Sequence, residues 1–90
     1  KMNKKFLDKV LDQIVSETRI DYDRKVIVTP LPIPPLSPPL FFPSVSPLIF
    51  TKHCRGVYGL NDDEVKYVWD EYKKIILNKT NGDNSFWNGR

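Results

Sequence analysis

The chain has 90 residues, of which 40% are hydrophobic and 28% are charged, and its formal net charge at pH 7 is +3. This length allows one small domain, and the single cysteine and single histidine exclude an internal disulfide and argue against a structural zinc site. Basic and acidic residues alternate along the chain, which is typical of solvated helix faces and argues against a concentrated nucleic-acid-binding patch.

The N-terminal unit, residues 1–20, is predicted to form a helix from about Asn3 to Thr18. Its apolar residues recur at helical spacing, and they are Phe6, Leu7, Val10, Leu11, Ile14 and Val15. The basic start resembles the flank of a signal peptide, but Asp8, Lys9 and Asp12 interrupt the apolar run that should follow. We therefore expect an intracellular or particle-associated protein.

Residues 21–29 are predicted to be a polar connection that leads into a short β-branched strand at Lys25–Thr29. All eight prolines then fall within residues 30–47, inside an uncharged run from Val26 to Thr51. Proline fixes φ, lacks an N–H donor and biases the preceding residue toward extended geometry. These residues are therefore predicted to form an extended polyproline-like arm with a reach of roughly 55 Å, and the prolines exclude a membrane-spanning helix here.

Residues 48–60 are predicted to be a strand followed by a loop. The run Leu48–Thr51 is expected to pair with the first strand, and a polar loop then carries His53 and Cys54, with the cysteine partly buried. Adjacent residues of an extended chain point to opposite sides, so this pair is a poor candidate for cysteine–histidine catalysis.

The strongest local signals belong to residues 61–80, which are predicted to form a helix. Asn61 and Glu64 match a capping box, and Leu60 with Val65 match a hydrophobic staple. The predicted apolar face comprises Val65, Val68, Trp69, Tyr72, Ile75 and Ile76. Residues 81–90 are predicted to be a polar tail.

The residues of this chain that could act in metal binding, base stacking or catalysis are better explained by structural roles. The acidic run Asp62–Glu64 suits the positive end of a helix better than a metal, and Trp69 and Tyr72 suit a core better than base stacking. No general base, nucleophile or metal-binding set is assembled by the pattern. We therefore expect a protein that is not an enzyme and that needs no cofactor.

Together these elements predict a mostly α fold, in which two amphipathic helices are joined by a long extended Pro-rich arm, with room for a short two-stranded β element. The apolar arm favours a structural subunit of a larger assembly that clamps a protein partner or associates with itself. The absence of alanine, with many Lys, Asn and Ile residues, is typical of AT-rich genomes, so a minor component of a virus particle is one example. The predicted partner contacts are Leu31, Ile33, Leu36, Leu40, Phe41, Phe42, Trp69 and Tyr72.

Two alternatives stay open from the sequence. The chain could be an adaptor whose prolines, in the spacing Pro32-x-x-Pro35 and Pro35-x-x-Pro38, are recognised by an SH3- or WW-type domain, although a flanking basic anchor is missing. It could also be a small nucleic-acid-binding protein with a strongly salt-dependent basic face. That face would comprise Lys4, Lys5, Lys9, Arg19, Arg24, Lys25, Lys52 and Arg55.

Overall fold

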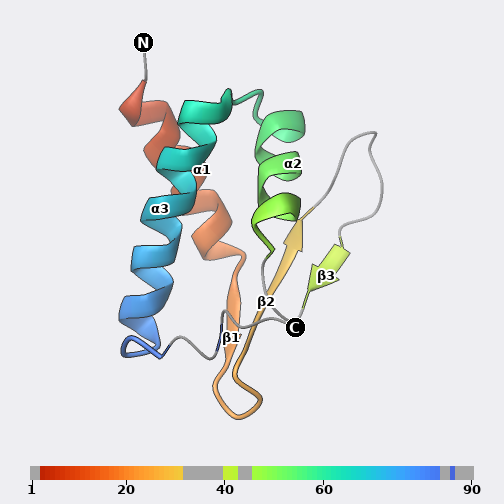
Figure 1. The fold of residues 1–90 in the computed structure, drawn as a ribbon, viewed down its shortest axis with the longest axis vertical. Helices are drawn as coiled ribbons and strands as arrows, with labels where there is room; N and C mark the ends of the chain where they lie inside the picture. The colour runs from red at the N-terminus through yellow and green to blue at the C-terminus, as the bar shows by residue number, and fades with distance from the viewer. Residues whose placement is uncertain (1–2, 32–39, 43–45, 84–85, 87–90) are drawn as a thin grey trace.

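The computed structural model describes residues 3–31, 40–42, 46–83 and 86, and the side chains of 40–42 are outside that description (Figure 1). The described chain is mostly helical with a small antiparallel sheet, so the predicted fold class holds at this level. Its elements are α1 (Lys4–Ser16), β1 (Arg19–Asp21), β2 (Val26–Leu31), β3 (Leu40–Phe42), α2 (Pro47–Val57) and α3 (Asp62–Lys79).

Helix α1 confirms the predicted N-terminal helix. Asn3 is its N-cap, and the Asn3 side chain accepts a hydrogen bond from the Phe6 N–H at 3.2 Å. The helix buries one apolar face, which consists of Leu7, Val10, Leu11 and Ile14. Phe6, at the edge of this face, stays 42% exposed.

Helix α2 replaces the strand and loop that were predicted for residues 48–60, and that prediction is wrong. Ser46 caps the helix by accepting from the Leu48 N–H, and Pro47 occupies the first turn, where its fixed φ and missing N–H suit a helix. Phe50, His53 and Cys54 are buried at helical spacing. The run Leu48–Thr51 resembled a strand, and this was misleading because burial against the other helices outweighs a weak strand propensity.

Helix α3 has the ends that the sequence predicts. The capping box is present in both directions, since Asn61 accepts from the Glu64 N–H and Glu64 accepts from the Asn61 N–H, each at 2.9 Å. The helix ends at Lys79 with Thr80 as its C-cap, and the two residues that follow, Asn81 and Gly82, adopt positive φ. The Gly82 N–H donates to the Leu77 carbonyl at 2.7 Å. These bonds satisfy backbone groups that a helix end leaves open.

The sheet has the order β1-β2-β3, with β2 antiparallel to both neighbours. Leu31 is paired with Leu40 in the antiparallel pairing of β2 and β3, so the chain reverses direction between these two residues. The prediction of one extended arm from Pro30 to Pro47 is therefore wrong, because Pro30 lies in β2 and Pro47 lies in α2. Pro30 is compatible with the strand because the pairing of β1 with β2 reaches only to Val28, so among the described residues Pro30 has no partner in β1.

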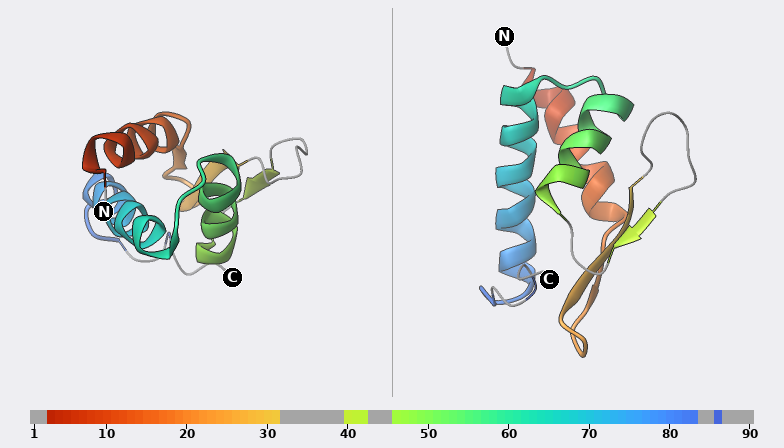
Figure 2. Two further views of the ribbon diagram at one scale, coloured as in Figure 1. Left: turned by 90° about the horizontal axis from the view of Figure 1, so that it is seen from above. Right: turned by 45° about the vertical axis from the view of Figure 1, so that its right-hand side comes forward.

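The three helices cover one face of the sheet (Figures 1 and 2). α3 packs against both α1 and α2, and the β1–β2 hairpin projects beyond the ends of the helices. An aromatic cluster joins α2 to α3: the Phe50 ring lies 4.8 Å from that of Trp69 and 5.2 Å from that of Tyr72. Ile27 and Leu31 complete this core from the inner face of β2.

The segment after α3 is not simply the polar tail that was predicted. Phe86 is buried in the core and makes an edge-to-face contact with Tyr22, with ring centroids 6.1 Å apart. Asp83 pairs with Lys25 at 3.2 Å, and the Tyr22 hydroxyl donates to the Lys79 carbonyl at 3.3 Å. These contacts fasten the tip of the β1–β2 hairpin to the end of α3.

The first prediction concerns the end of α3. Gly82→Ala should lower the free energy of unfolding by about 1 kcal/mol, because φ of +76° is unfavourable for alanine while no atom within 4 Å would clash with the new Cβ. Urea unfolding followed by circular dichroism measures this change. Asn81→Gly is the matched control, since φ of 56° suits glycine better than asparagine, and it should not destabilise the chain. Equal losses in both variants would contradict this account of the helix end.

The second prediction concerns Thr29, whose buried hydroxyl has no hydrogen-bond partner among the residues that the structure describes. Thr29→Val keeps the shape and removes the unsatisfied group, so it should raise the free energy of unfolding by about 1 kcal/mol. Thr80 is the control, because its buried hydroxyl donates to the Ile76 carbonyl at 3.0 Å. Thr80→Val should be destabilising by about 0.5–1 kcal/mol. A loss of stability in Thr29→Val would show that its hydroxyl is satisfied in solution.

Candidate interaction surface

The outer face of β2 is apolar. Residues of this strand alternate between buried and partly exposed, and Ile27, Thr29 and Leu31 are the buried ones. The partly exposed residues are Val26, Val28 and Pro30, on the face away from the helices. An antiparallel sheet with one face in water normally carries polar residues there. This apolar stripe therefore marks the outer face as a candidate for contact with another molecule.

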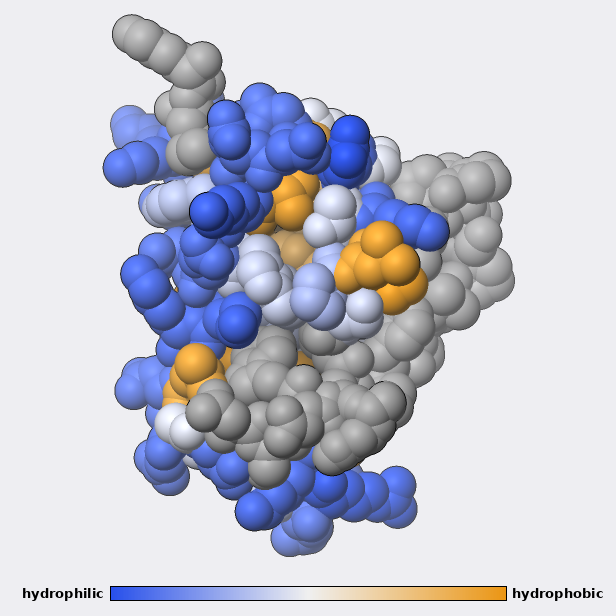
Figure 3. Space-filling view, viewed as in Figure 1, coloured by the Kyte–Doolittle hydropathy of each residue, from blue (hydrophilic) through white to orange (hydrophobic). Residues whose placement is uncertain are grey.

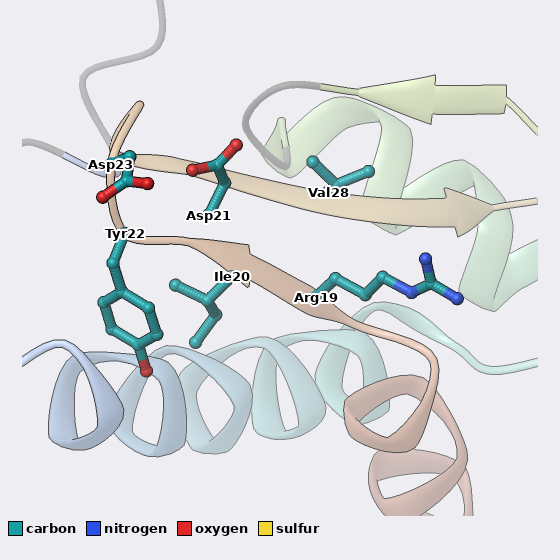
Figure 4. A pocket seen from close by; sticks show the side chains of 6 residues that line it. All are labelled: Arg19, Ile20, Asp21, Tyr22, Asp23 and Val28. Carbon is teal, nitrogen blue, oxygen red and sulfur yellow. The ribbon is translucent and has the colours of Figure 1, made fainter.

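Strand β1 places charges beside the stripe. Arg19 is paired with Val28 and Asp21 with Val26, and directly opposed residues of neighbouring strands share a face. Arg19 and Asp21 therefore flank the two valines. Figure 4 shows Arg19 at one end of β1 and Asp21 with Asp23 at the other, so the positive and negative charges are separated along the strand.

The turn of the hairpin holds Asp21 in place. Its carboxylate accepts a hydrogen bond from the Arg24 N–H at 3.0 Å and lies 3.9 Å from the Arg24 side chain. Lys25 completes the turn with φ of 57°. The negative end of the outer face is therefore fixed by backbone contacts, whereas Arg19 is exposed.

Two open hollows border this face, with volumes of about 630 and 510 Å³, and the first extends around the edge of β1 to Ile20 and Tyr22. Arg19 and Val28 line both of them. The first also involves Ile20, Asp21, Tyr22 and Asp23, and the second involves Ser16, Glu17 and Pro30. The hollows leave room for side chains of a molecule that lies against the sheet.

A second apolar feature lies on α2. Leu48, in its first turn, is 62% exposed, the largest exposure among the large hydrophobic residues described. Figure 3 shows separate hydrophobic spots on this side of the molecule, including one over α2, while the outer side of α3 is hydrophilic. Leu48 is therefore an exposed apolar group on a rigid element.

The partner contacts predicted from the sequence are dispersed in the structure. Leu31 and Tyr72 are fully buried in the core, so neither is accessible to a partner of the folded chain, and Trp69 packs against Phe50 and is partly buried. Leu40, Phe41 and Phe42 form β3, with only their backbone described, and Ile33 and Leu36 lie outside the described residues.

Sequence reasoning missed the outer face of the sheet. Its signal was present, because Val26–Leu31 is apolar at every position except Thr29, as expected of a strand that is covered on both sides. The pairing with Arg19 and Asp21 was not readable, since residues 19–21 carry two charges and have no clear strand pattern. Leu48 was missed because its run was interpreted as a strand.

His53 and Cys54 belong to α2 and face inward. Burial raises the pKa of the Cys54 thiol to about 12, so the nucleophilic thiolate is scarce at neutral pH. His53 packs edge-to-face on Tyr58, with ring centroids 5.4 Å apart. Within the part of the chain that the structure describes, no three His, Cys, Asp or Glu residues are grouped as metal ligands.

Some of the candidate basic residues are ion-paired. Three of the eight candidates for nucleic-acid contact are ion-paired: Arg24 with Asp21, Lys25 with Asp83, and Arg55 with Asp62. Such pairing offsets the positive potential that attracts phosphates. As for a membrane, no helix among the described residues has both the length and the apolar character to cross a bilayer.

Comparisons with known proteins add no relative from which a role could be transferred. The chain matches no protein-family model, no curated protein and no solved structure. Its function therefore has to be inferred from the geometry of this chain alone.

The third prediction concerns alkaline pH. Burial raises the pKa of Cys54 from 9.0 and that of Tyr72 from 10.0, each to about 12, so the folded chain holds both protons more tightly than the unfolded chain. The stability that these two groups contribute is therefore fully present below their unfolded pKa values, and it should be lost between about pH 9 and 12, by about 1.4 kcal/mol per pH unit for each group that titrates.

Urea unfolding across this pH range measures the slope. Cys54→Ala is the matched variant: it should be less stable at neutral pH because it leaves a small cavity, yet its stability should fall less steeply with pH. A free energy of unfolding that stays constant to pH 11, or an unchanged slope in Cys54→Ala, would contradict the assignment.

Proposed function

We propose that the chain is a non-enzymatic subunit of a larger protein assembly, and that it binds a protein partner through the start of α2 and the adjoining Pro-rich segment. The observation that supports this proposal best is the 62% exposure of Leu48 at the end of an uncharged run. Burial of one leucine side chain contributes about 1.5–3 kcal/mol. An apolar anchor at this position is useful to the chain only when something covers it.

Leu48 is also held in a fixed position. Ser46 caps the helix, Pro47 restricts the first turn, and Phe50 anchors the same turn in the core. A side chain mounted on such a rigid element loses little conformational entropy when it binds. Isolated exposed leucines are common on protein surfaces, so the argument depends on this rigidity together with the neighbouring apolar run.

The Pro-rich segment is proposed to contribute as a shorter clamp than the sequence suggested, because Leu31 and Leu40 are paired at its base. Its candidate contacts remain Ile33, Leu36 and the side chains of residues 40–42. Burial keeps the Cys54 thiol protonated at neutral pH, which agrees with a role outside catalysis. The adaptor alternative depends on Pro32, Pro35 and Pro38, which lie outside the described residues. The nucleic-acid alternative gains less support, since several basic residues are ion-paired.

The fourth prediction tests this surface with a photo-crosslinking amino acid at position 48, in cells that naturally produce the chain. We expect a discrete adduct with another protein. The control position is Lys66, which is exposed on the hydrophilic side of α3 and should give no such adduct.

Leu48→Asp should then reduce co-purification of the crosslinked protein by roughly tenfold or more, which corresponds to the loss of one buried anchor. Its circular dichroism and unfolding midpoint should match those of the wild type, because Leu48 is not part of the core. Identical adducts at positions 48 and 66, or full retention of the partner by Leu48→Asp, would refute the proposal.

A further inference from the structure

On the outer face of the sheet, two neighbouring rows each pair one charged residue with one valine, and the charge is positive in one row and negative in the other. Each cross-strand row holds one charged residue of β1 and one valine of β2: Arg19 with Val28 in the first row, and Asp21 with Val26 in the second. The two rows are about 6.6 Å apart, since a strand rises about 3.3 Å per residue. A molecule that covers this face has to offer an acid, a base and two apolar groups at matching positions.

A second copy of the same face meets this requirement. When it is turned by a two-fold axis that crosses the strands between the two rows, Arg19 of each copy faces Asp21 of the other. The same rotation places Val28 opposite Val26. Because a two-fold interface repeats every contact, it forms two ion pairs between the β1 strands beside two apolar contacts between the β2 strands, without any other ligand.

We propose that two copies of this chain associate face to face through the outer surface of β1 and β2, with reciprocal Arg19–Asp21 pairs. Packed sheets lie about 10 Å apart, and the hollows beside Val28, of about 630 and 510 Å³, accept the facing side chains. The inference rests on the proposed function only in treating the chain as an interaction subunit, because Leu48 and the Pro-rich segment are not used.

Charged residues at the rim of this face influence the affinity of the two copies for each other. In the same arrangement Glu17 of one copy lies toward Asp23 of the other, and both are exposed, so salt screens their repulsion. Asp21 already accepts from the Arg24 N–H and is therefore oriented before association. The covered area is small, which places the pair among weak, concentration-dependent dimers.

The fifth prediction is tested by charge exchange. Light scattering on the full chain from about 10 µM to about 1 mM should show the mass rising from the 10.5 kDa of one chain toward twice that value. Arg19→Asp alone and Asp21→Arg alone should each remain monomeric, because each places like charges opposite one another. An equal mixture of the two variants should dimerise, because in the mixed pair both contacts again join opposite charges.

Further variants show whether the dimer uses this face of the sheet. Lys66→Asp reverses a charge on the far side of α3 and should dimerise like the wild type, and Val28→Glu should be monomeric while keeping the wild-type circular dichroism. Leu48→Asp should also dimerise normally, so a failure of the proposed function at α2 leaves this result unaffected. A monomeric wild type at every concentration, a mixture that stays monomeric, or a dimer that survives Arg19→Asp and Val28→Glu would overturn the proposal.

Discussion

The contacts of Tyr72 hold the separate parts of this fold together. Its ring packs against Phe50 of α2, and its hydroxyl lies 3.0 Å from the Thr18 hydroxyl, at the junction of α1 and β1. Thr18 uses its single proton to donate to the Ile14 carbonyl at 2.8 Å, so the Tyr72 hydroxyl is the donor of the pair. A single fully buried side chain on α3 thereby fixes the position of α2 and the direction in which the chain leaves α1 for the sheet. Small domains depend strongly on such shared contacts, because their cores are limited in size.

This arrangement leaves β2 as a strand whose two faces have different environments. Its inner residues are covered by the helices, while its outer valines are flanked by the charges of β1. The Pro-rich run contributes its first residues to β2 and its last proline to α2, so it is joined to the core at both ends. The molecule therefore combines a firmly packed helical side with an apolar sheet surface and an exposed leucine, and both surfaces are suited to protein contacts.

Helices α1 and α3 were predictable because their signals are local. Asn3 and Asn61 cap the helices within three residues, and the buried positions of each helix recur at helical spacing. Helix α2 had a local signal as well, in Ser46 followed by Pro47, but the run Leu48–Thr51 after it favoured a strand. Strands β1 and β3 had no usable signal, since three residues are too short for a pattern and each is stabilised by its pairing with β2.

By itself, the sequence determined the mostly helical class, the N-terminal helix, the capped helix after Asn61, a strand that overlaps residues 25–29 and the apolar character of the Pro-rich run, because each depends on neighbouring residues. Only the tertiary structure decided which apolar residues are covered. It buries Leu31, Tyr72 and Phe86, exposes Leu48, and places Arg19 and Asp21 beside two valines on one face. The physical reason is that exposure and cross-strand register depend on residues far apart in the chain. A one-residue change of register would turn every side chain of a strand to the other face.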